Sequence, residues 1–211
     1  MTVTMLNKAF AAAGAAAWGG LPFSELAEDM TAEAIAKAEE LCLNPRTVLV
    51  AAFPYYAGDR PGNLSLYARG RDYHQVVTGR LNTVCDFVRE KYENGLFLPA
   101  ADNSPLPERQ AAWRCGIGLR GKNGLVILPP YGTYVFLGTI LTDQALDLPP
   151  SAPSPDCVGC GKCAESCPQH TIQIRDGKAV IHYKNCIRCF CCHEMCPKHV
   201  IDIRRWRLLH F

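Results

Sequence analysis

The sequence CVGCGKCAESCP at residues 157–168 is followed by a second copy of its pattern, CIRCFCCHEMCP, at residues 186–197. Both runs have the spacing Cys-x-x-Cys-x-x-Cys-x-x-x-Cys-Pro, and each cysteine of the second run lies 29 positions after its counterpart. Three thiolates in a tight loop suit three irons of one [4Fe–4S] cube, and the fourth cysteine then reaches a neighbouring cube. The duplication therefore predicts two [4Fe–4S] clusters in a compact C-terminal domain.

The spacing resembles that of bacterial two-cluster ferredoxins, in which the last cysteine of each run ligates the cluster of the other run. We assign one cluster to Cys157, Cys160, Cys163 and Cys196. We assign the second cluster to Cys186, Cys189, Cys192 and Cys167. Zinc sites usually take four ligands in two short pairs, and disulfides need an oxidising compartment. Both alternatives therefore fit two runs of four cysteines less well than iron–sulfur clusters do.

Short strands are predicted beside the cysteine runs. Residues 172–174 and 179–181 flank Asp176-Gly177, which is a strong signal for a β-hairpin. Residues 200–203 form a similar apolar segment after the second run. Cys191, between two predicted ligands, is expected to be a bystander, with an alternative ligand role less favoured. The other cysteines outside the pattern are expected to be buried core thiols: Cys42, Cys85 and Cys115.

The composition is that of a globular protein with its own core. The chain has 211 residues, a formal charge of +2 and 48% hydrophobic residues, and this balance does not call for nucleic acid. No run of 18 apolar residues is present, so no membrane span is expected. The alanine-rich residues 9–18 are interpreted as a helix rather than a signal peptide, and a cytoplasmic location is expected.

Helices and strands alternate irregularly in the first part of the chain. We predict helices over residues 6–17, ended by Gly19-Gly20, and from the N-cap Thr31 to before Pro45, with Leu41 on the buried face. The best helical pattern is that of Val77, Leu81, Val84, Cys85, Val88 and Tyr92, ended by Asn94-Gly95. Strands are predicted at residues 47–53 and 97–100, and a hairpin is predicted from residues 125–128 and 134–141.

These patterns predict an α+β fold with a mostly antiparallel or mixed sheet over residues 1–145, because the strands and helices lack βαβ alternation. A proline-rich linker follows at residues 146–156, and the ferredoxin-like domain occupies residues 157–211. A ferredoxin alone needs only the last part of the chain, so the first domain is expected to hold an electron acceptor. Gly116-x-Gly118-x-x-Gly121 is a weak hint of a Rossmann site, since no strand precedes it and no helix follows it.

Four sequence blocks, in order and followed by the cysteine runs, carry a family resemblance. They are YARGRDYH at 67–74, DNSPLPER at 102–109, GIGLRGKN at 116–123 and FLGTILTD at 136–143. Over residues 45–200 the chain resembles the epoxyqueuosine reductases and, more distantly, the reductive dehalogenases. The resemblance implies base-off cobalamin fed by the two clusters, a first domain with a nitroreductase-like or cobalamin-processing-like fold, and reduction of an epoxide or another carbon–heteroatom bond.

The resemblance also implies residue roles. Asp102 matches the acid that gives a proton to the substrate, and an aspartate shielded from water would have a raised pKa suited to that role. The block that lines the corrinoid and substrate pocket is matched by Tyr67, Arg69, Asp72, Tyr73 and His74. The loop at the corrin edge and a nearby strand are matched by Gly118, Gly121, Lys122, Asn123 and Gly138. The alternatives are that Asp102 only starts a turn and that His74 only faces its helix start.

Partners and competing functions follow from the same resemblance. An external low-potential donor, such as a ferredoxin, a flavodoxin or a reductase, is expected to supply electrons. Epoxyqueuosine reductases carry a helical-repeat tail that helps to hold tRNA, and this sequence ends shortly after its second cysteine run. A small-molecule or modified-nucleoside substrate is therefore expected, with tRNA as the less favoured alternative. The competing functions are a non-catalytic electron carrier that docks a partner enzyme, and a flavin-dependent reductase.

Overall fold

The computed structural model describes residues 3–56, 66–121, 125–148, 152–156, 171–175, 178–182 and 184. The two predicted cluster sites, Cys191 and the predicted strand at 200–203 lie outside these residues, as do Lys122 and Asn123. The description that follows therefore concerns the first part of the chain and one short hairpin.

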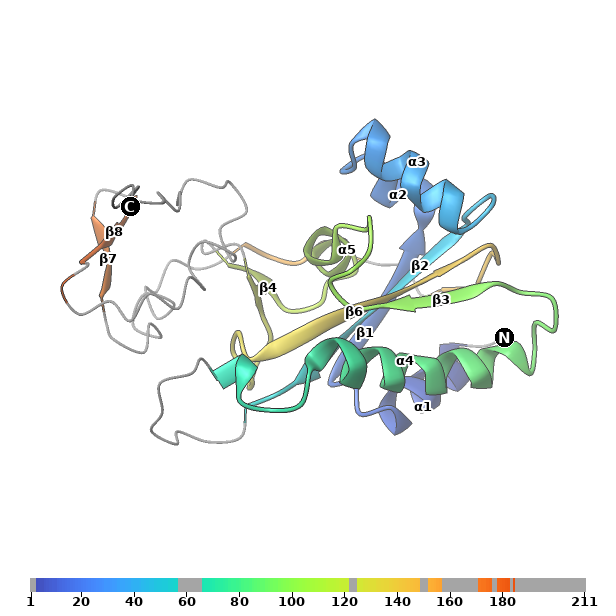
Figure 1. The fold of residues 1–211 in the computed structure, drawn as a ribbon, viewed down its shortest axis with the longest axis horizontal. Helices are drawn as coiled ribbons and strands as arrows, with labels where there is room; N and C mark the ends of the chain where they lie inside the picture. Colours follow the sequence, from blue (N-terminus) through green and yellow to red (C-terminus); the bar gives the residue numbers. More distant parts are fainter. Residues whose placement is uncertain are drawn as a thin grey trace, which may run out of the picture.

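A four-stranded antiparallel sheet forms the centre of the fold, in the order β1-β2-β6-β3 (Figure 1). Its strands are β1 (Ala17–Pro22), β2 (Thr47–Pro54), β6 (Val135–Thr142) and β3 (Phe97–Ala100). The predicted strand at 47–53 is confirmed, and all seven of these residues are buried. β6 pairs with β2 on one side, where Phe53 lies opposite Phe136, and with β3 on the other.

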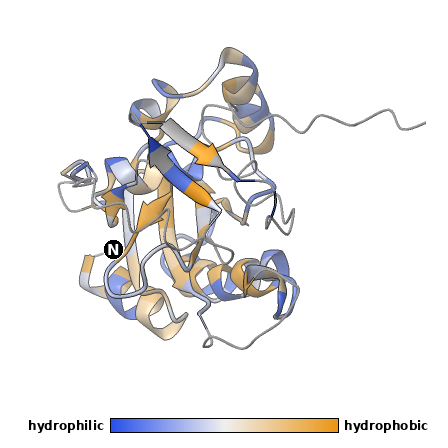
Figure 2. Cartoon of the chain, turned by 90° about the vertical axis from the view of Figure 1, so that its left-hand side faces the viewer, coloured by the Kyte–Doolittle hydropathy of each residue, from blue (hydrophilic) through white to orange (hydrophobic). Residues whose placement is uncertain are grey.

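Helices cover both faces of this sheet. α1 (Val3–Ala12) and α4 (Tyr73–Arg89) pack on one face, where Leu49, Ala51 and Phe53 of β2 point. α2 (Phe23–Ala27), α3 (Ala32–Leu41) and α5 (Glu108–Arg114) accompany the second core, which contains Val48, Val50 and Ala52. Successive residues of β2 thus enter opposite cores, as the alternation of a strand requires. Figure 2 shows the apolar strands between these helical layers.

The remaining elements are short. They are the 3-10 turn η1 (Leu66–Ala68), the antiparallel pair β4 (Leu119–Arg120) and β5 (Val126–Ile127), and the hairpin of β7 (Ile172–Arg175) with β8 (Lys178–Ile181). The hairpin prediction at 172–181 is confirmed, and so is the α+β class with antiparallel pairing among the named strands. No helix in the described part of the chain has the length and apolar character needed to cross a membrane.

The strongest helical prediction is confirmed in α4. Val77, Leu81, Val84, Cys85 and Val88 are all buried, at the spacing of one helix face. The helix ends at Arg89, one turn before the predicted Asn94-Gly95. The predicted cap of α3 is also present, because Oγ1 of Thr31 accepts a hydrogen bond of 3.2 Å from the backbone N–H of Ala34.

The prediction that Gly19-Gly20 ends the first helix is wrong. α1 stops at Ala12, and both glycines lie in β1. A Cβ on Gly19 would lie 2.6 Å from Cβ of Cys115, and one on Gly20 would lie 2.7 Å from Leu148. The glycines therefore permit close packing on a strand. Leu41, predicted on the buried face of α3, is 56% exposed, because α3 turns only Ala38 and the adjoining Cys42 fully inward.

The hairpin predicted from residues 125–128 and 134–141 is also wrong. β5 pairs with β4, whereas β6 lies between β2 and β3 in the main sheet. Pro129 and Pro130 between the segments lack the N–H groups that a hairpin ladder would use. The described residues of the predicted linker run along the first domain, where Ser154 N donates to Trp113 O at 2.6 Å and Arg120 N donates to Pro155 O at 2.9 Å.

Candidate functional site

The first turn of α4 holds a pair of polar side chains in fixed positions. Asp72 is the N-cap, and its Oδ1 accepts from the backbone N–H of His74 at 3.0 Å. The same oxygen lies 2.7 Å from Nδ1 of the His74 ring. These hydrogen bonds with His74 lower the pKa of the Asp72 carboxyl below its usual value. One carboxylate therefore both starts the helix and orients the imidazole.

Asp102 comes from the other side of the site, two residues after the end of β3, and meets this turn. Its Oδ2 accepts a hydrogen bond of 2.7 Å from the hydroxyl of Tyr73 and lies 3.6 Å from Nε2 of His74. Its backbone has φ of +65°, a conformation that few non-glycine residues adopt. The side chain is 65% exposed, so the described residues do not shield it from water as the sequence interpretation expected. The structure thus brings together four of the predicted site residues, namely Asp72, Tyr73, His74 and Asp102.

Glu108, at the start of α5, is a member of this cluster that the sequence analysis missed. Its Oε1 accepts a hydrogen bond of 2.8 Å from the backbone N–H of Asp102. Burial raises the pKa of the Glu108 carboxyl to about 7. The sequence signal was present, since Glu108 lies in the same DNSPLPER block as Asp102. The contact depends on how the loop between the two residues closes, which the spacing alone does not specify.

A column of stacked rings connects this cluster to the central strands. The ring of Phe136 on β6 stacks on Tyr55 at 4.2 Å and on Tyr73 at 4.4 Å, and Tyr73 stacks on His74 at 4.0 Å between centroids. Burial and the hydrogen bond to Asp102 raise the pKa of Tyr73, so its hydroxyl stays protonated and remains a donor. The stack therefore holds the Tyr73 hydroxyl against Asp102.

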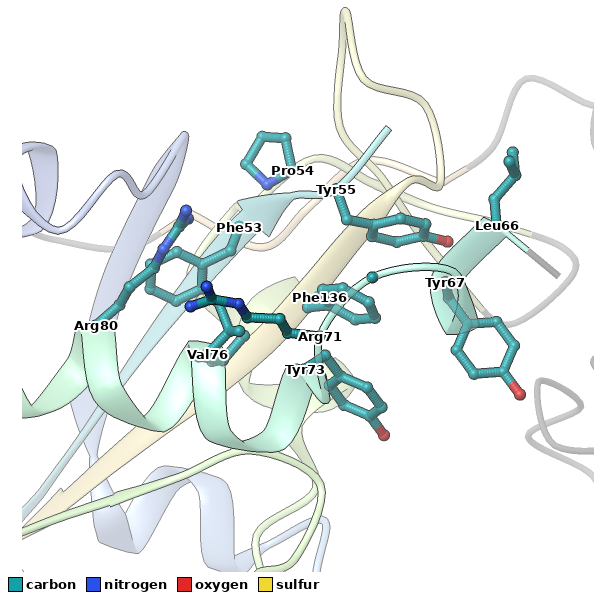
Figure 3. A pocket seen from close by; sticks show the side chains of 12 residues that line it. Phe53, Pro54, Tyr55, Leu66, Tyr67, Arg71, Tyr73, Val76, Arg80 and Phe136 are labelled. Atoms are coloured by element: carbon teal, nitrogen blue, oxygen red, sulfur yellow. The ribbon is translucent and has the colours of Figure 1, made fainter. Parts of the chain in front are cut away.

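A pocket of about 200 Å³ lies beside the column (Figure 3). Its lining combines aromatic rings with two arginines, namely Phe53, Pro54, Tyr55, Leu66, Tyr67, Gly70, Arg71, Tyr73, Val76, Val77, Arg80 and Phe136. Two predicted site residues, Tyr67 and Tyr73, belong to it. The other described candidates do not line it: Arg69, Asp72, His74, Asp102, Gly118, Gly121 and Gly138.

The predicted glycines have packing reasons of their own. Gly138 lies in β6 beneath α4, where a Cβ would be 2.6 Å from Val77 and 2.8 Å from Leu81. Gly118 has φ of +69°, and a Cβ there would lie 2.6 Å from the carbonyl oxygen of Ile127. Gly121 N donates to Leu125 O at 2.9 Å. The Rossmann context is absent, because α5 precedes this motif and β4 lies within it.

Two family models match the chain. The first, "Epoxyqueuosine reductase QueG, DUF1730", matches residues 36–102, and the second, "4Fe-4S dicluster domain", matches residues 151–197. The second match spans all eight cysteines of the two predicted cluster sites, so the prediction of a dicluster domain is confirmed. Within the described residues, no group of three or more His, Cys, Asp or Glu side chains is arranged to hold a metal ion.

Curated relatives agree with the first match. Epoxyqueuosine reductase from Synechocystis is 36% identical over 141 residues, which cover 63% of this chain and 48% of the relative. The chain resembles the epoxyqueuosine reductases. The enzyme from Bacillus cereus is 37% identical over 112 residues, which cover 53% of this chain and 29% of the relative. The chain thus spans half the length or less of these curated relatives, and the predicted resemblance is confirmed.

Solved structures show the same fold. Epoxyqueuosine reductase from Streptococcus thermophilus aligns over 97% of this chain and 69% of its own, with a TM-score of 0.65 and 23% identity. An epoxyqueuosine reductase solved with an epoxyqueuosine-modified tRNA stem loop covers 93% of this chain and 64% of its own, with a TM-score of 0.63 and 21% identity. A reductive dehalogenase described as B12-dependent covers 79% of this chain and 22% of its own, with a TM-score of 0.50 and 16% identity.

Proposed function

We propose that this chain is an oxidoreductase of the epoxyqueuosine reductase type, which uses cobalamin and two [4Fe–4S] clusters to reduce an epoxide or another carbon–heteroatom bond. The observation that carries the proposal is the hydrogen bond between Tyr73 and Asp102 beside the His74 ring. It joins two of the sequence blocks on which the resemblance rests. The sequence similarity to epoxyqueuosine reductases supports the same activity.

The residues at the start of α4 suit a corrinoid. A corrin ring with amide-bearing side chains needs an apolar surface edged by hydrogen-bonding groups. The edges of the Phe136 and Tyr73 rings supply the first, because the stack covers their faces, and His74 and the exposed Asp102 supply the second. Cobalamin, when bound, supplies a strongly reducing cobalt centre that the clusters recharge. We propose that Tyr67, Arg69, Asp72, Tyr73 and His74 belong to its site, on a first domain of nitroreductase-like or cobalamin-processing-like fold.

The protein's own residues would supply the protons that the reaction consumes. Removal of an epoxide oxygen as water takes two electrons and two protons, so an acid must stand beside the reacting bond. We propose that Asp102 takes up protons from water and passes them to the reacting bond, since its carboxyl group is exposed and held at one oxygen by Tyr73. Glu108 accepts a hydrogen bond from the backbone N–H of Asp102 and so holds the backbone of Asp102 in place, which makes Glu108 a positioning residue. In this proposal the corrinoid domain spans residues 1–145, the linker spans residues 146–156 and the electron-transfer domain spans residues 157–211.

The substrate and the donor belong to the same proposal. Because one relative is solved with an epoxyqueuosine-modified tRNA stem loop, a modified nucleoside carried by tRNA is the first substrate to test. A free modified nucleoside or another small epoxide is the second. An external ferredoxin, flavodoxin or reductase would charge the clusters, because the described residues have no Rossmann-type nicotinamide-binding context of their own.

Anaerobic protein titrated with hydroxocobalamin tests the proposal. We expect a base-off absorbance spectrum that saturates near one corrinoid per chain, and turnover of an epoxyqueuosine-modified stem loop with a chemical reductant. Asp102→Asn should remove turnover and leave reduction of the bound cofactor intact, whereas Asp147→Asn, a change at an exposed acid far along the sequence, should leave both intact. Absence of corrinoid binding would leave an electron carrier as the function, and full turnover of Asp102→Asn would remove the assigned proton donor.

A further inference from the structure

Two arginines, Arg71 and Arg80, line the pocket beside the start of α4. Arg71 directly precedes the N-cap of the helix, and Arg80 lies seven residues after Tyr73 on the same helix face. Cζ of Arg80 lies 5.7 Å from the centroid of the Phe53 ring. Figure 3 shows both arginine side chains extending toward that ring. The pocket therefore holds two cations, one from the start of α4 and one from two turns into the helix.

These charges are not compensated within the described ranges. The twelve lining residues include no Asp or Glu, and neither arginine forms an ion pair with a described acid. Both arginines are exposed residues, so their guanidinium groups can reach a ligand that enters the pocket. A bound anion would accept hydrogen bonds from them and neutralise positive charge.

Two other arginines of the same domain, Arg89 and Arg114, are placed differently. Arg89 forms an ion pair of 2.9 Å with Asp86, and Arg114 forms ion pairs of 2.6 Å with Asp29 and 3.1 Å with Glu28. The Arg114 pairs tie α5 to the two residues that follow α2, and the Arg89 pair lies within α4. Arg71 and Arg80 form no ion pair with a described acid and also line the pocket, so both remain available to a ligand there.

We propose that Arg71 and Arg80 together bind a phosphodiester group. A guanidinium fork donates two parallel hydrogen bonds, so one arginine already satisfies both oxygens of a carboxylate. A phosphodiester presents two non-bridging oxygens, which share one negative charge, and two ester oxygens around a tetrahedral centre, so two forks can bind it from different directions. The pocket, at about 200 Å³, is smaller than the roughly 300–1,000 Å³ typical of sites for whole drug-sized ligands. It therefore suits the phosphodiester and the atoms next to it.

Two molecules in the proposed function carry this group, and for their identity the inference rests on that function. Cobalamin has one phosphodiester in its nucleotide loop, and RNA has one between each pair of nucleotides. The phosphodiester itself does not depend on the proposed function, because it is inferred from the charges and the volume of the pocket alone.

The test compares Arg71→Gln/Arg80→Gln with a control, Lys37→Gln/Lys91→Gln, which removes the same charge from exposed positions elsewhere. Each protein, with clusters intact, is titrated anaerobically with cobalamin, with cobinamide, which lacks the phosphodiester and nucleotide, and with a tRNA anticodon stem loop at several salt concentrations. Circular dichroism checks that each variant is folded.

Each outcome decides the proposal. If the pocket holds the cofactor phosphodiester, the arginine variant loses at least 10-fold in affinity for cobalamin and keeps its affinity for cobinamide. If the pocket holds an RNA phosphodiester, affinity for the stem loop falls and the slope of log affinity against log salt becomes shallower by roughly 1–2. If both affinities equal those of the control, the proposal is overturned.

A third measurement separates this proposal from the proposed function. If the wild-type chain binds neither corrinoid nor stem loop, the proposed function fails, and dimethyl phosphate then probes the pocket directly. We expect it to raise the thermal midpoint of the wild-type chain relative to chloride at equal ionic strength, and not that of the arginine variant. If dimethyl phosphate shifts the thermal midpoints of the two proteins by the same amount, the phosphodiester site is overturned.

Discussion

The hydroxyl of Tyr73 donates a 2.7 Å hydrogen bond to Asp102, a residue 29 positions further along the chain. Tyr73→Phe removes this donor and keeps the ring that stacks on Phe136 and His74. Because a hydrogen bond to a charged group contributes about 1.5–3 kcal/mol, we expect single-turnover rates to fall roughly 10- to 100-fold with the thermal midpoint nearly unchanged. Tyr131→Phe, at an exposed loop tyrosine, is the control. An unaltered rate in Tyr73→Phe would contradict a role for this hydroxyl.

Glu108 should make the stability of the chain depend on pH. Burial raises its pKa to about 7 in the folded protein, against about 4.5 ordinarily, so the folded state binds its proton more tightly than the unfolded state. This contribution to stability is fully present below about pH 4.5 and is lost as the pH rises through 7.

Glu108→Gln removes the titrating carboxyl group. Comparing the unfolding free energies of the wild-type chain and this variant therefore isolates the contribution of Glu108. Between pH 5 and pH 8 we expect the wild-type chain to lose about 2 kcal/mol of unfolding free energy relative to Glu108→Gln, after allowance for partial solvent screening. Urea unfolding at the two pH values measures this difference. The control is Glu39→Gln, at an exposed glutamate of α3. A difference between wild type and Glu108→Gln that is the same at both pH values would show that Glu108 does not titrate in this range.

Two glycines with positive φ separate backbone strain from steric overlap. Gly118 and Gly132 have φ of +69° and +62°, but only Gly118 has a neighbour, Ile127 O, within 2.6 Å of an added Cβ. Alanine at Gly132 should cost about 1 kcal/mol from its left-handed backbone. Alanine at Gly118 should cost roughly 2 kcal/mol more, because the obstacle is backbone. Chemical denaturation of both variants measures the difference, and equal losses would mean that β4 and β5 can separate at little cost.

Iron analysis tests the predicted cluster ligands. Two [4Fe–4S] clusters hold about eight irons per chain. We expect Cys163→Ala to lose about half of this iron or more and Cys191→Ala to retain it, because only Cys163 is assigned as a ligand. Iron and sulfide are measured on anaerobically purified protein, with electron paramagnetic resonance of the reduced sample. Loss of iron from Cys191→Ala with retention in Cys163→Ala would reverse the assignment.

Local sequence patterns correctly predicted the elements whose apolar residues follow a regular helix or strand pattern. The helix of Val77, Leu81 and Val84 and the strand at 47–53 repeat at the period of their own structure, so neighbours need not be known. Gly19-Gly20 misled the prediction, because glycine ends helices and also permits close packing in strands. The neighbours that decide between these roles, Cys115 and Leu148, lie far along the chain.

The same limit applied to the site. The family blocks identified Tyr73, His74 and Asp102, which the fold brings into contact. Glu108 was not identified, because its contact is to a backbone N–H whose direction depends on the positive φ of Asp102. Arg71 was not identified either, since its position in the pocket follows from the path of the chain into α4 rather than from its sequence neighbours.

Asp72 accepts from both the backbone and the ring of His74. Fraying of the first turn of α4 would consequently release the imidazole, and a ligand that pulls on the imidazole would unwind that turn. Folding of the first turn of α4 and positioning of the His74 ring are thus a single equilibrium. Hydrogen exchange at the backbone amide of His74 would report this equilibrium without any substrate present.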